Sequence, residues 1–256
     1  MAVSNKLSKG TTTAKKTTEN AVVKYMANGV EIKLTPTMVK SYLVSGDKER
    51  VTDQEVAMFI NLCKYAGLNP WLKEAYCIKY GTEPATMVTG KEAFTKRAEH
   101  TPEFDGMQAG IITIDGDGEV RYREGAMKAP DDEIIGGWAE VFRKDRTHST
   151  RIEVSFDEYA ARKKDGTLNQ QWSKKPATMI RKVAIVQALR EAFPTNMGGM
   201  YAAEELGETE AEAGGVMTQP EINDETGEVI DAEVVEKKPA RKEERPEPED
   251  PGESLI

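Results

Sequence analysis

The chain has 256 residues, of which 35 are Lys or Arg, 44 are Asp or Glu and 2 are His, so its formal net charge is −9. It contains no run of eighteen apolar residues and no signal peptide, which argues against a membrane-spanning or secreted protein and predicts a cytoplasmic one. From Glu204 onward there are 18 acidic and 5 basic residues, which leaves 26 acidic and 30 basic residues before that point. A weakly basic body with an acidic tail is typical of nucleic-acid-binding proteins, although a tail that only confers solubility fits equally well.

The two ends are poor in residues that a core would bury. Residues 1–22 are rich in Lys, Thr and Ser, and residues 206–256 are rich in Glu, Gly and Pro. We expect both segments to be disordered, because they bury too little apolar surface to offset the entropy lost on folding, and we expect residues 23–205 to form one core domain. Within the tail, Glu221–Glu236 alternates acids with Ile and Val, which fits either a motif that orders on a partner or a flexible segment.

Helix signals dominate the first part of the core. Thr35-Pro36 begins a helix that Gly46 ends. A capping box at Thr52–Glu55 begins a second helix with apolar residues at helical spacing, and Gly67 ends it. The following LNPW at Leu68–Trp71 turns the chain, and its tryptophan is expected to anchor this turn in the core.

Strand signals dominate the second part. It begins with an extended run at Ala75–Tyr80 and a helix that a second capping box starts at Thr89–Glu92. The expected strands are Met107–Ile114, Val120–Arg123, Gly137–Arg143 and Thr150–Phe156. A short helix capped at Ser155 is expected to end at Lys164, and a long helix to run from about 176 to 192. This order predicts an α+β fold, in which helices flank a small antiparallel sheet, a long C-terminal helix is central, and no βαβ alternation occurs.

Short motifs that would indicate catalysis are incomplete. TGK at Thr89–Lys91 is similar to part of a phosphate-binding loop, but Ala85 and Glu92 stand where such a loop needs Gly and a hydroxyl residue. Asp115–Glu119 lacks the further acids of a calcium loop and predicts a hairpin turn instead. His100 and His148 belong to no triad or zinc motif.

These gaps exclude several classes of enzyme. Cys63 and Cys77 have no further ligands beside them and predict buried, reduced thiols. We therefore expect no catalytic residue, no metal site, no cofactor and no use of ATP, so that the protein is not an enzyme. Scattered acids still leave a magnesium-dependent nuclease open.

The segment from Gln171 to Phe193 carries the strongest functional signal. It places cations along and just before an apolar helix, which predicts a helix that packs inward and offers its cations at one place. Arg181 and Arg190 either pair with acids, such as Glu191 or Asp157, or bind an anionic ligand. A nucleic-acid backbone is the natural anionic candidate.

Four separated blocks carry a resemblance to a known family. They are Leu68–Trp71 with Lys73, Glu74 and Tyr76; Glu103–Met107; Phe142–Arg146 with His148; and Trp172, Pro176, Met179, Arg181, Gln187, Arg190, Ala192 and Phe193. In order and spacing, over about residues 50–200, they resemble the RecT and Red beta (Bet) family of phage single-strand annealing proteins. The resemblance implies an ATP-independent recombinase that coats single-stranded DNA, pairs complementary strands and holds the annealed duplex in a homo-oligomeric ring or helical filament.

The resemblance also implies partners and an origin. It points to a phage or prophage protein in the cytoplasm of a bacterial host, with an exonuclease or the host single-strand-binding protein as partner, no membrane, and magnesium acting only through DNA. Carried over by position, the family's DNA channel falls on Lys73, Arg143, Lys144, Arg146, Arg181 and Arg190. The expected basic and aromatic neighbours in the same DNA-binding surface are Trp172, Lys174, Lys175 and Lys182. A magnesium-dependent nuclease and a passive single-strand-binding protein stay as alternatives.

Overall fold

The computed structural model describes residues 21–206, 219–224, 226, 227 and 229–231. Over this part of the chain the protein is a mixed α+β structure with antiparallel sheets and several helices, which confirms the expected class. The arm expected at 1–22 and most of the tail expected at 206–256 lie outside the described residues.

A β-hairpin begins the described chain. β1 (Val23–Ala27) pairs antiparallel with β2 (Val30–Leu34). The two residues between them, Asn28 and Gly29, have φ angles of 49° and 81°, which is the left-handed pair that a type I′ turn requires. Our expected elements begin only at Thr35, although Asn-Gly between two apolar strands is a strong hairpin signal.

The first helix is shorter than expected. Thr35 caps α1 (Pro36–Met38) by accepting a hydrogen bond from the backbone N of Met38 at 3.2 Å. The chain continues through the π-helical stretch η1 (Val39–Leu43) and then forms β3 (Val44–Gly46). Gly46 therefore ends a strand and not a helix, and it lies so close to the Lys79 carbonyl that any Cβ would clash with it.

Helix α2 (Asp53–Ala66) has the two ends that its sequence specifies. Thr52 and Glu55 bond each other reciprocally in a capping box, and Gly67 ends the helix at a φ of 57°. The helix connects β3 to the parallel strand β4 (Ala75–Lys79), and β5 (Thr86–Thr89) pairs with β4 antiparallel. This βαβ crossover corrects our expectation that none occurs, because a three-residue strand such as β3 is too short to show a recognisable pattern.

The second large sheet is antiparallel throughout. Its order is β7–β6–β8–β9, and its strands are β6 (Phe104–Ile114), β7 (Val120–Glu124), β8 (Glu133–Arg143) and β9 (Thr150–Ser155). Between β6 and β7, the Asp115 carboxylate accepts hydrogen bonds from the backbone N of Asp117 at 3.1 Å and of Glu119 at 2.9 Å. Asp115 thus holds a hairpin turn, as the sequence predicts.

The remaining helices accompany this sheet. They are α3 (Lys91–Glu99), α4 (Phe156–Tyr159), α5 (Gln170–Lys174), α6 (Pro176–Ala192), α7 (Pro194–Met197) and the short 3₁₀ turns η2 (Lys48–Arg50), η3 (Pro70–Leu72) and η4 (Ala203–Leu206). The N-cap of α3 is Gly90 and not Thr89, so no side chain caps this helix by a hydrogen bond. The helix α4 stops at Tyr159 and not at Lys164, because the chain then folds into a narrow loop.

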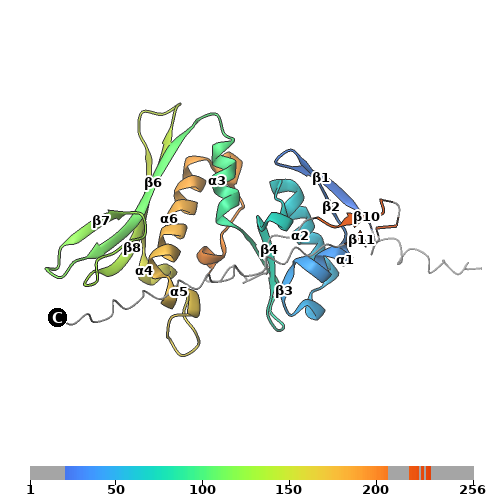
Figure 1. The fold of residues 1–256 in the computed structure, drawn as a ribbon, viewed down its shortest axis with the longest axis horizontal. Coiled ribbons are helices and arrows are strands. Elements are labelled where there is room, and N and C mark those ends of the chain that lie inside the picture. The colour runs from blue at the N-terminus through green and yellow to red at the C-terminus, as the bar shows by residue number, and fades with distance from the viewer. Residues whose placement is uncertain (1–20, 207–218, 225, 228, 232–256) are drawn as a thin grey trace, which may run out of the picture.

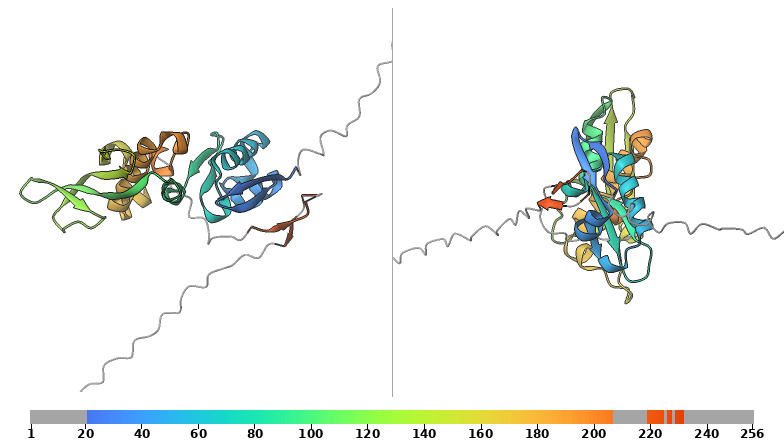
Figure 2. Two further views of the ribbon diagram at one scale, coloured as in Figure 1. Left: turned by 90° about the horizontal axis from the view of Figure 1, so that it is seen from above. Right: turned by 90° about the vertical axis from the view of Figure 1, so that its right-hand side faces the viewer.

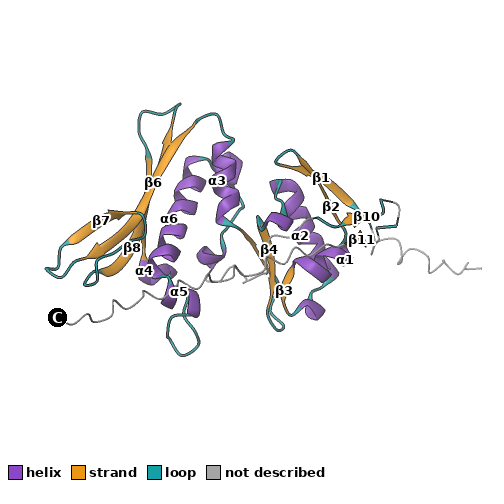
Figure 3. Cartoon of the chain, in the orientation of Figure 1, coloured by secondary structure: helices purple, strands orange, loops and turns teal. Residues whose placement is uncertain are grey.

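The elements form two halves along the long axis of the molecule. We call residues 23–89 the N-terminal half and residues 91–206 the C-terminal half; Figures 1 and 2 show them side by side. In Figure 3, α3 and α6 lie between the four-stranded sheet and the N-terminal half. One hydrophobic core includes residues from both halves, for example Phe59 and Leu189. The close packing of α6 on the sheet depends on Gly137, where a Cβ would lie 2.7 Å from the carbonyl oxygen of Ile180.

A small hairpin from the acidic stretch lies beside the N-terminal half (Figure 1). β10 (Glu221–Ile222) pairs with β11 (Val229–Asp231). Ile222 is buried, and the Asp224 carboxylate accepts hydrogen bonds from Lys24 at 2.6 Å and from Lys33 at 2.8 Å. Part of the segment for which we expected no structure without a partner thus packs on the chain's own core.

Candidate nucleic-acid interface

Helix α6 is buried on nearly every side. Pro176 begins it, at a position where the missing N–H costs no helical bond. The buried residues are Met179, Ile180, Val183, Ala184, Ile185, Val186, Ala188, Leu189 and Ala192. Its long polar side chains are half-buried among them, so the partners of these side chains decide what they do.

Two cations of α6 are held by acids of η4. Lys182 Nζ lies 3.0 Å from Glu204 Oε1, and Arg190 donates to the two oxygens of Glu205 at 2.8 and 2.6 Å. The side chains of Glu204 and Glu205 are 1% and 4% exposed. The hydrogen bond to Glu205 raises the pKa of Arg190 above its ordinary value. Glu204 and Glu205 belong to the start of the acidic stretch. The acids that we considered as partners from the sequence were Glu191 and Asp157.

Arg181 points to the opposite side of the helix from Arg190. Nine residues at 100° per residue place the two side chains about 180° apart. The Nε of Arg181 donates to the carbonyl of Ala109 on β6 at 3.2 Å, whereas Arg190 faces η4 and lies over the Tyr201 ring at 4.7 Å. The expectation that α6 offers its cations at one place is therefore wrong.

Arg143 also has internal partners. Its guanidinium donates to the carbonyl of Ala192, where α6 ends, and to the two oxygens of Asp145 at 2.8 and 2.7 Å. It lies over the Phe193 ring at 4.6 Å, and its side chain is 14% exposed. Arg143 therefore ties β8 to the end of α6, and little of its charge faces a ligand.

Trp172 belongs to the core. Its side chain is fully buried and meets the ring of Phe156 edge to face, with centroids 5.5 Å apart. A ring with no exposed surface cannot stack on a base, so the expected DNA contact of Trp172 is corrected to a packing role.

The LNPW segment folds around a buried acid. The Glu74 carboxylate, whose side chain is 1% exposed, accepts hydrogen bonds from the backbone N of Asn69 at 2.8 Å and from Lys96 Nζ at 2.7 Å. Trp71 is 2% exposed, which confirms its expected place in the core. Lys73 has a φ of 60° and is half-buried at the end of the turn. Lys73 is therefore less exposed than a lysine on an open surface.

The other expected DNA contacts are exposed. Lys144 and Arg146 lie in the turn between β8 and β9, and Lys174 and Lys175 lie where α5 meets α6. None of these four forms an ion pair with another residue that the structure describes. They are the members of the expected set whose charge is available to a ligand.

Sequence reasoning missed two more exposed cations. Lys163 and Lys164 lie in the narrow loop between α4 and α5, and over the described ranges they too have no ion pair. The carboxylate of that loop, Asp165, accepts hydrogen bonds from Thr167 instead. The sequence signal that could have found them is the Lys163-Lys164 dipeptide in a polar segment, which has the same composition as Lys174-Lys175. With those two, these residues form a group of four, which we call the α5 lysines.

Other chemistry has little to build on. Cys63 and Cys77 are buried free thiols, as expected, and burial raises the pKa of Cys77 to about 11. No group of three His, Cys, Asp or Glu side chains comes together as a metal site within the described ranges. In the same part of the chain, every helix is too short or too polar to cross a bilayer.

Comparison with known proteins places the chain in a family. The RecT family model matches residues 29–216, most of the chain. The recombination protein bet of Escherichia phage lambda is 26% identical over 192 residues, which cover 71% of this chain and 64% of that protein. An uncharacterized protein, UU154, of Ureaplasma parvum serovar 3 is 26% identical over 190 residues, 73% of this chain and 75% of that protein. The chain therefore spans a little under two thirds of the lambda protein, and it belongs to the RecT family.

Proposed function

We propose that this protein binds single-stranded DNA and anneals complementary strands without ATP, as a recombinase of a phage or prophage in the bacterial cytoplasm. Its similarity to the lambda recombination protein and the cations of its C-terminal half support this function. In this proposal it acts without a catalytic residue or cofactor, and magnesium contributes only through DNA.

The observation that carries the proposal is the exposure of the α5 lysines. Most other cations of the C-terminal half have a carboxylate or carbonyl partner, for example Arg121 with Asp115 and Arg123 with Asp132. The α5 lysines have none among the described residues. Exposed amines that form no ion pair attract a polyanion and release its counterions on binding.

Lysine suits annealing better than a base-reading residue would. Its ammonium is a compact point charge on a flexible stem, and it contacts phosphate without fixing the position of a base. A strand held through its phosphates keeps its base edges free to test a complementary strand. Lys144 and Arg146, in the β8–β9 turn near the other end of α6, would add further phosphate contacts in the same half.

Assembly and partners belong to the finer part of the proposal. Subunits side by side, in a ring or a helical filament, would join their α5 lysines into a continuous track for DNA. A phage exonuclease would supply the single strands, and that exonuclease, the host single-strand-binding protein or both would be partners of this chain.

The test is the pairing rate of two complementary labelled oligonucleotides, with magnesium and without nucleotide. We expect the wild-type chain to accelerate pairing and the variant Lys163→Ala/Lys164→Ala/Lys174→Ala/Lys175→Ala to lose most of that acceleration. The control is Lys48→Ala/Arg50→Ala, which removes two exposed cations from η2 in the N-terminal half and should leave the rate unchanged.

The other outcomes identify the alternatives. Strands that shorten when magnesium is added would mean a nuclease. Strands that are bound but pair no faster than free strands would mean a passive single-strand-binding protein. Full annealing by the quadruple variant would leave the function in place and move the phosphate contacts elsewhere.

A further inference from the structure

Helix α2 has an apolar stripe on its outer face. Its inner face consists of Val56, Phe59, Ile60 and Cys63, all buried. Met58, Leu62 and Tyr65 follow each other at helical spacing on the other side. Met58 is 55% exposed and Tyr65 is 84% exposed. A solvated face of a helix normally carries charges at such positions, so this stripe calls for a ligand.

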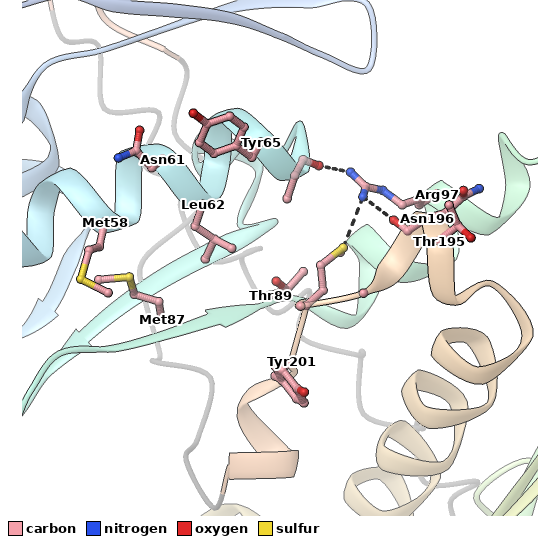
Figure 4. Close-up of a pocket in the computed structure, with 14 residues that line it drawn as sticks. Met58, Asn61, Leu62, Tyr65, Met87, Thr89, Arg97, Thr195, Asn196 and Tyr201 are labelled. Atoms are coloured by element: carbon pink, nitrogen blue, oxygen red, sulfur yellow. Dashed lines mark hydrogen bonds between the residues drawn. The ribbon is translucent and has the colours of Figure 1, made fainter.

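The stripe forms one wall of a pocket between the two halves. The pocket has a volume of about 630 Å³, within the range of ~300–1,000 Å³ that is usual for ligand sites. Figure 4 shows Met58 and Met87 at one end, Arg97 and Asn196 at the other, and Tyr201 below. Thioethers, phenol rings and amides dominate the lining, and Leu62 is its largest aliphatic residue.

The charge of the pocket favours an anionic chain. Its lining contains no Asp or Glu and one cation, Arg97, which donates to the carbonyls of Ala66 and Asn196. The ring of Tyr201 lies under Arg190 of α6. The charge of Arg190 is met by the carboxylate of Glu205. A negatively charged backbone therefore meets no carboxylate of the lining at this surface, and Arg97 supplies positive charge at one end of it.

We propose that this pocket, lined by Met58, Tyr65, Met87 and Tyr201, receives the unpaired bases of single-stranded DNA. The inference rests on the proposed function and adds to it a base-binding surface that is separate from the phosphate-binding lysines. Bases offer flat apolar faces and polar edges, which match the rings and sulfurs and the amides of Asn61 and Asn196.

The pocket distinguishes single strands from duplex. In a duplex each base is stacked and paired, so its face cannot enter a pocket, whereas an unpaired base can. The first strand would therefore occupy the pocket until its complement arrives, and pairing would withdraw its bases. Contacts through thioethers and half-exposed rings are weak enough for this exchange.

The test compares two strands of equal length, one of thymidine nucleotides and one with abasic sites throughout, which keeps the phosphates but lacks bases. We expect the wild-type chain to bind the normal strand more tightly than the abasic one, by about 10- to 100-fold. Met58→Ala/Tyr65→Ala should remove most of this difference while leaving affinity for the abasic strand unchanged. The matched control is Tyr80→Ala/Met127→Ala, because Tyr80 and Met127 are 52% and 84% exposed and line no part of the pocket.

A second variant reports the contact directly. The native tryptophans Trp71, Trp138 and Trp172 are 2%, 7% and 0% exposed, so Tyr65→Trp adds an exposed fluorophore. Its emission should change on binding the thymidine strand and not on binding the abasic strand or a duplex.

Three results would overturn the inference. One is an equal preference for bases in wild type and Met58→Ala/Tyr65→Ala. Another is a change in assembly size in that variant, which would make the stripe a contact between copies of the chain. The third is unchanged Tyr65→Trp emission with every strand. If the wild-type chain still binds and anneals DNA, each of these results leaves the proposed function in place. If the wild-type chain binds no DNA, both the proposed function and the base-binding inference are wrong.

Discussion

Two groups of cations in the C-terminal half differ in what surrounds them. Lys182 and Arg190 on α6 lie against Glu204 and Glu205, whose side chains are buried. The α5 lysines, a few residues earlier in the chain, are exposed and form no ion pair with another described residue. The first group holds η4 to the core, and the second has charge to offer a ligand. A cation in a matching motif is therefore a weak predictor of a DNA contact until its partner is known.

The largest expected effect concerns the α5 lysines. Each phosphate contact with a single strand contributes about 0.7 to the slope of log affinity against log salt concentration. If all four α5 lysines contact phosphates, their replacement by Ala should lower the magnitude of this slope by about 3. Affinity for single strands at 50 mM salt should then fall by at least 100-fold. Titrations of a labelled strand at several salt concentrations measure both quantities, and an unchanged slope would mean that these amines touch no phosphate.

The next largest effect concerns Arg190. Arg190→Ala leaves the buried carboxylate of Glu205 without its cation, and breaking such a pair costs about 3–5 kcal/mol. Because part of Arg190 is exposed, we expect a loss of about 3 kcal/mol in the free energy of unfolding, measured by urea denaturation. The double variant Arg190→Ala/Glu205→Ala should recover part of that loss. A large drop in DNA affinity without any loss of stability would mean that Arg190, like the α5 lysines, offers its charge to DNA.

A third pair tests the same logic in the N-terminal half. Lys79 donates to Glu55 at 2.7 Å, and this hydrogen bond, followed by that from Thr52, lowers the pKa of Glu55 to about 2. A depressed pKa stabilises the fold above the unfolded value of about 4.5 and loses that effect as pH falls through 2. Glu55→Gln should therefore cost about 2 kcal/mol at pH 7, and the difference from wild type should shrink between pH 4.5 and 2. Urea unfolding at several pH values checks this, and a difference that is independent of pH would contradict it.

The smallest effect concerns Trp172. Trp172→Phe keeps an aromatic ring in the core and should cost about 1–2 kcal/mol of stability. Affinity for single-stranded DNA, measured by anisotropy, should not change. A weaker binder of unchanged stability would show that this ring does reach the ligand.

Local signals predicted local structure well. The capping box at Thr52 and Glu55, the stop at Gly67 and the turn at Asp115 each involve residues within a few positions of one another, and all are present. The Asn28-Gly29 turn carries a signal of the same kind, because two adjacent residues that tolerate a positive φ stand between two short strands.

Long-range pairing was not predictable in the same way. The parallel pairing of β3 with β4 joins Val44 to Cys77, and nothing near either residue specifies it. The same holds for Arg190 with Glu205, because an acid fifteen residues away looks like part of the acidic stretch. The motif match therefore named the right family, but it could not separate cations that bind within the protein from those left for a ligand.

The hairpin turn at Asn28-Gly29 has a consequence for how the protein ages. The side-chain amide of Asn28 donates to the two oxygens of Glu74 at 3.2 and 3.4 Å. Asparagine is thermolabile, and loss of its amide nitrogen by hydrolysis produces a carboxylate. That product would set two negative charges against each other beside the LNPW segment, so storage of the protein should loosen this region.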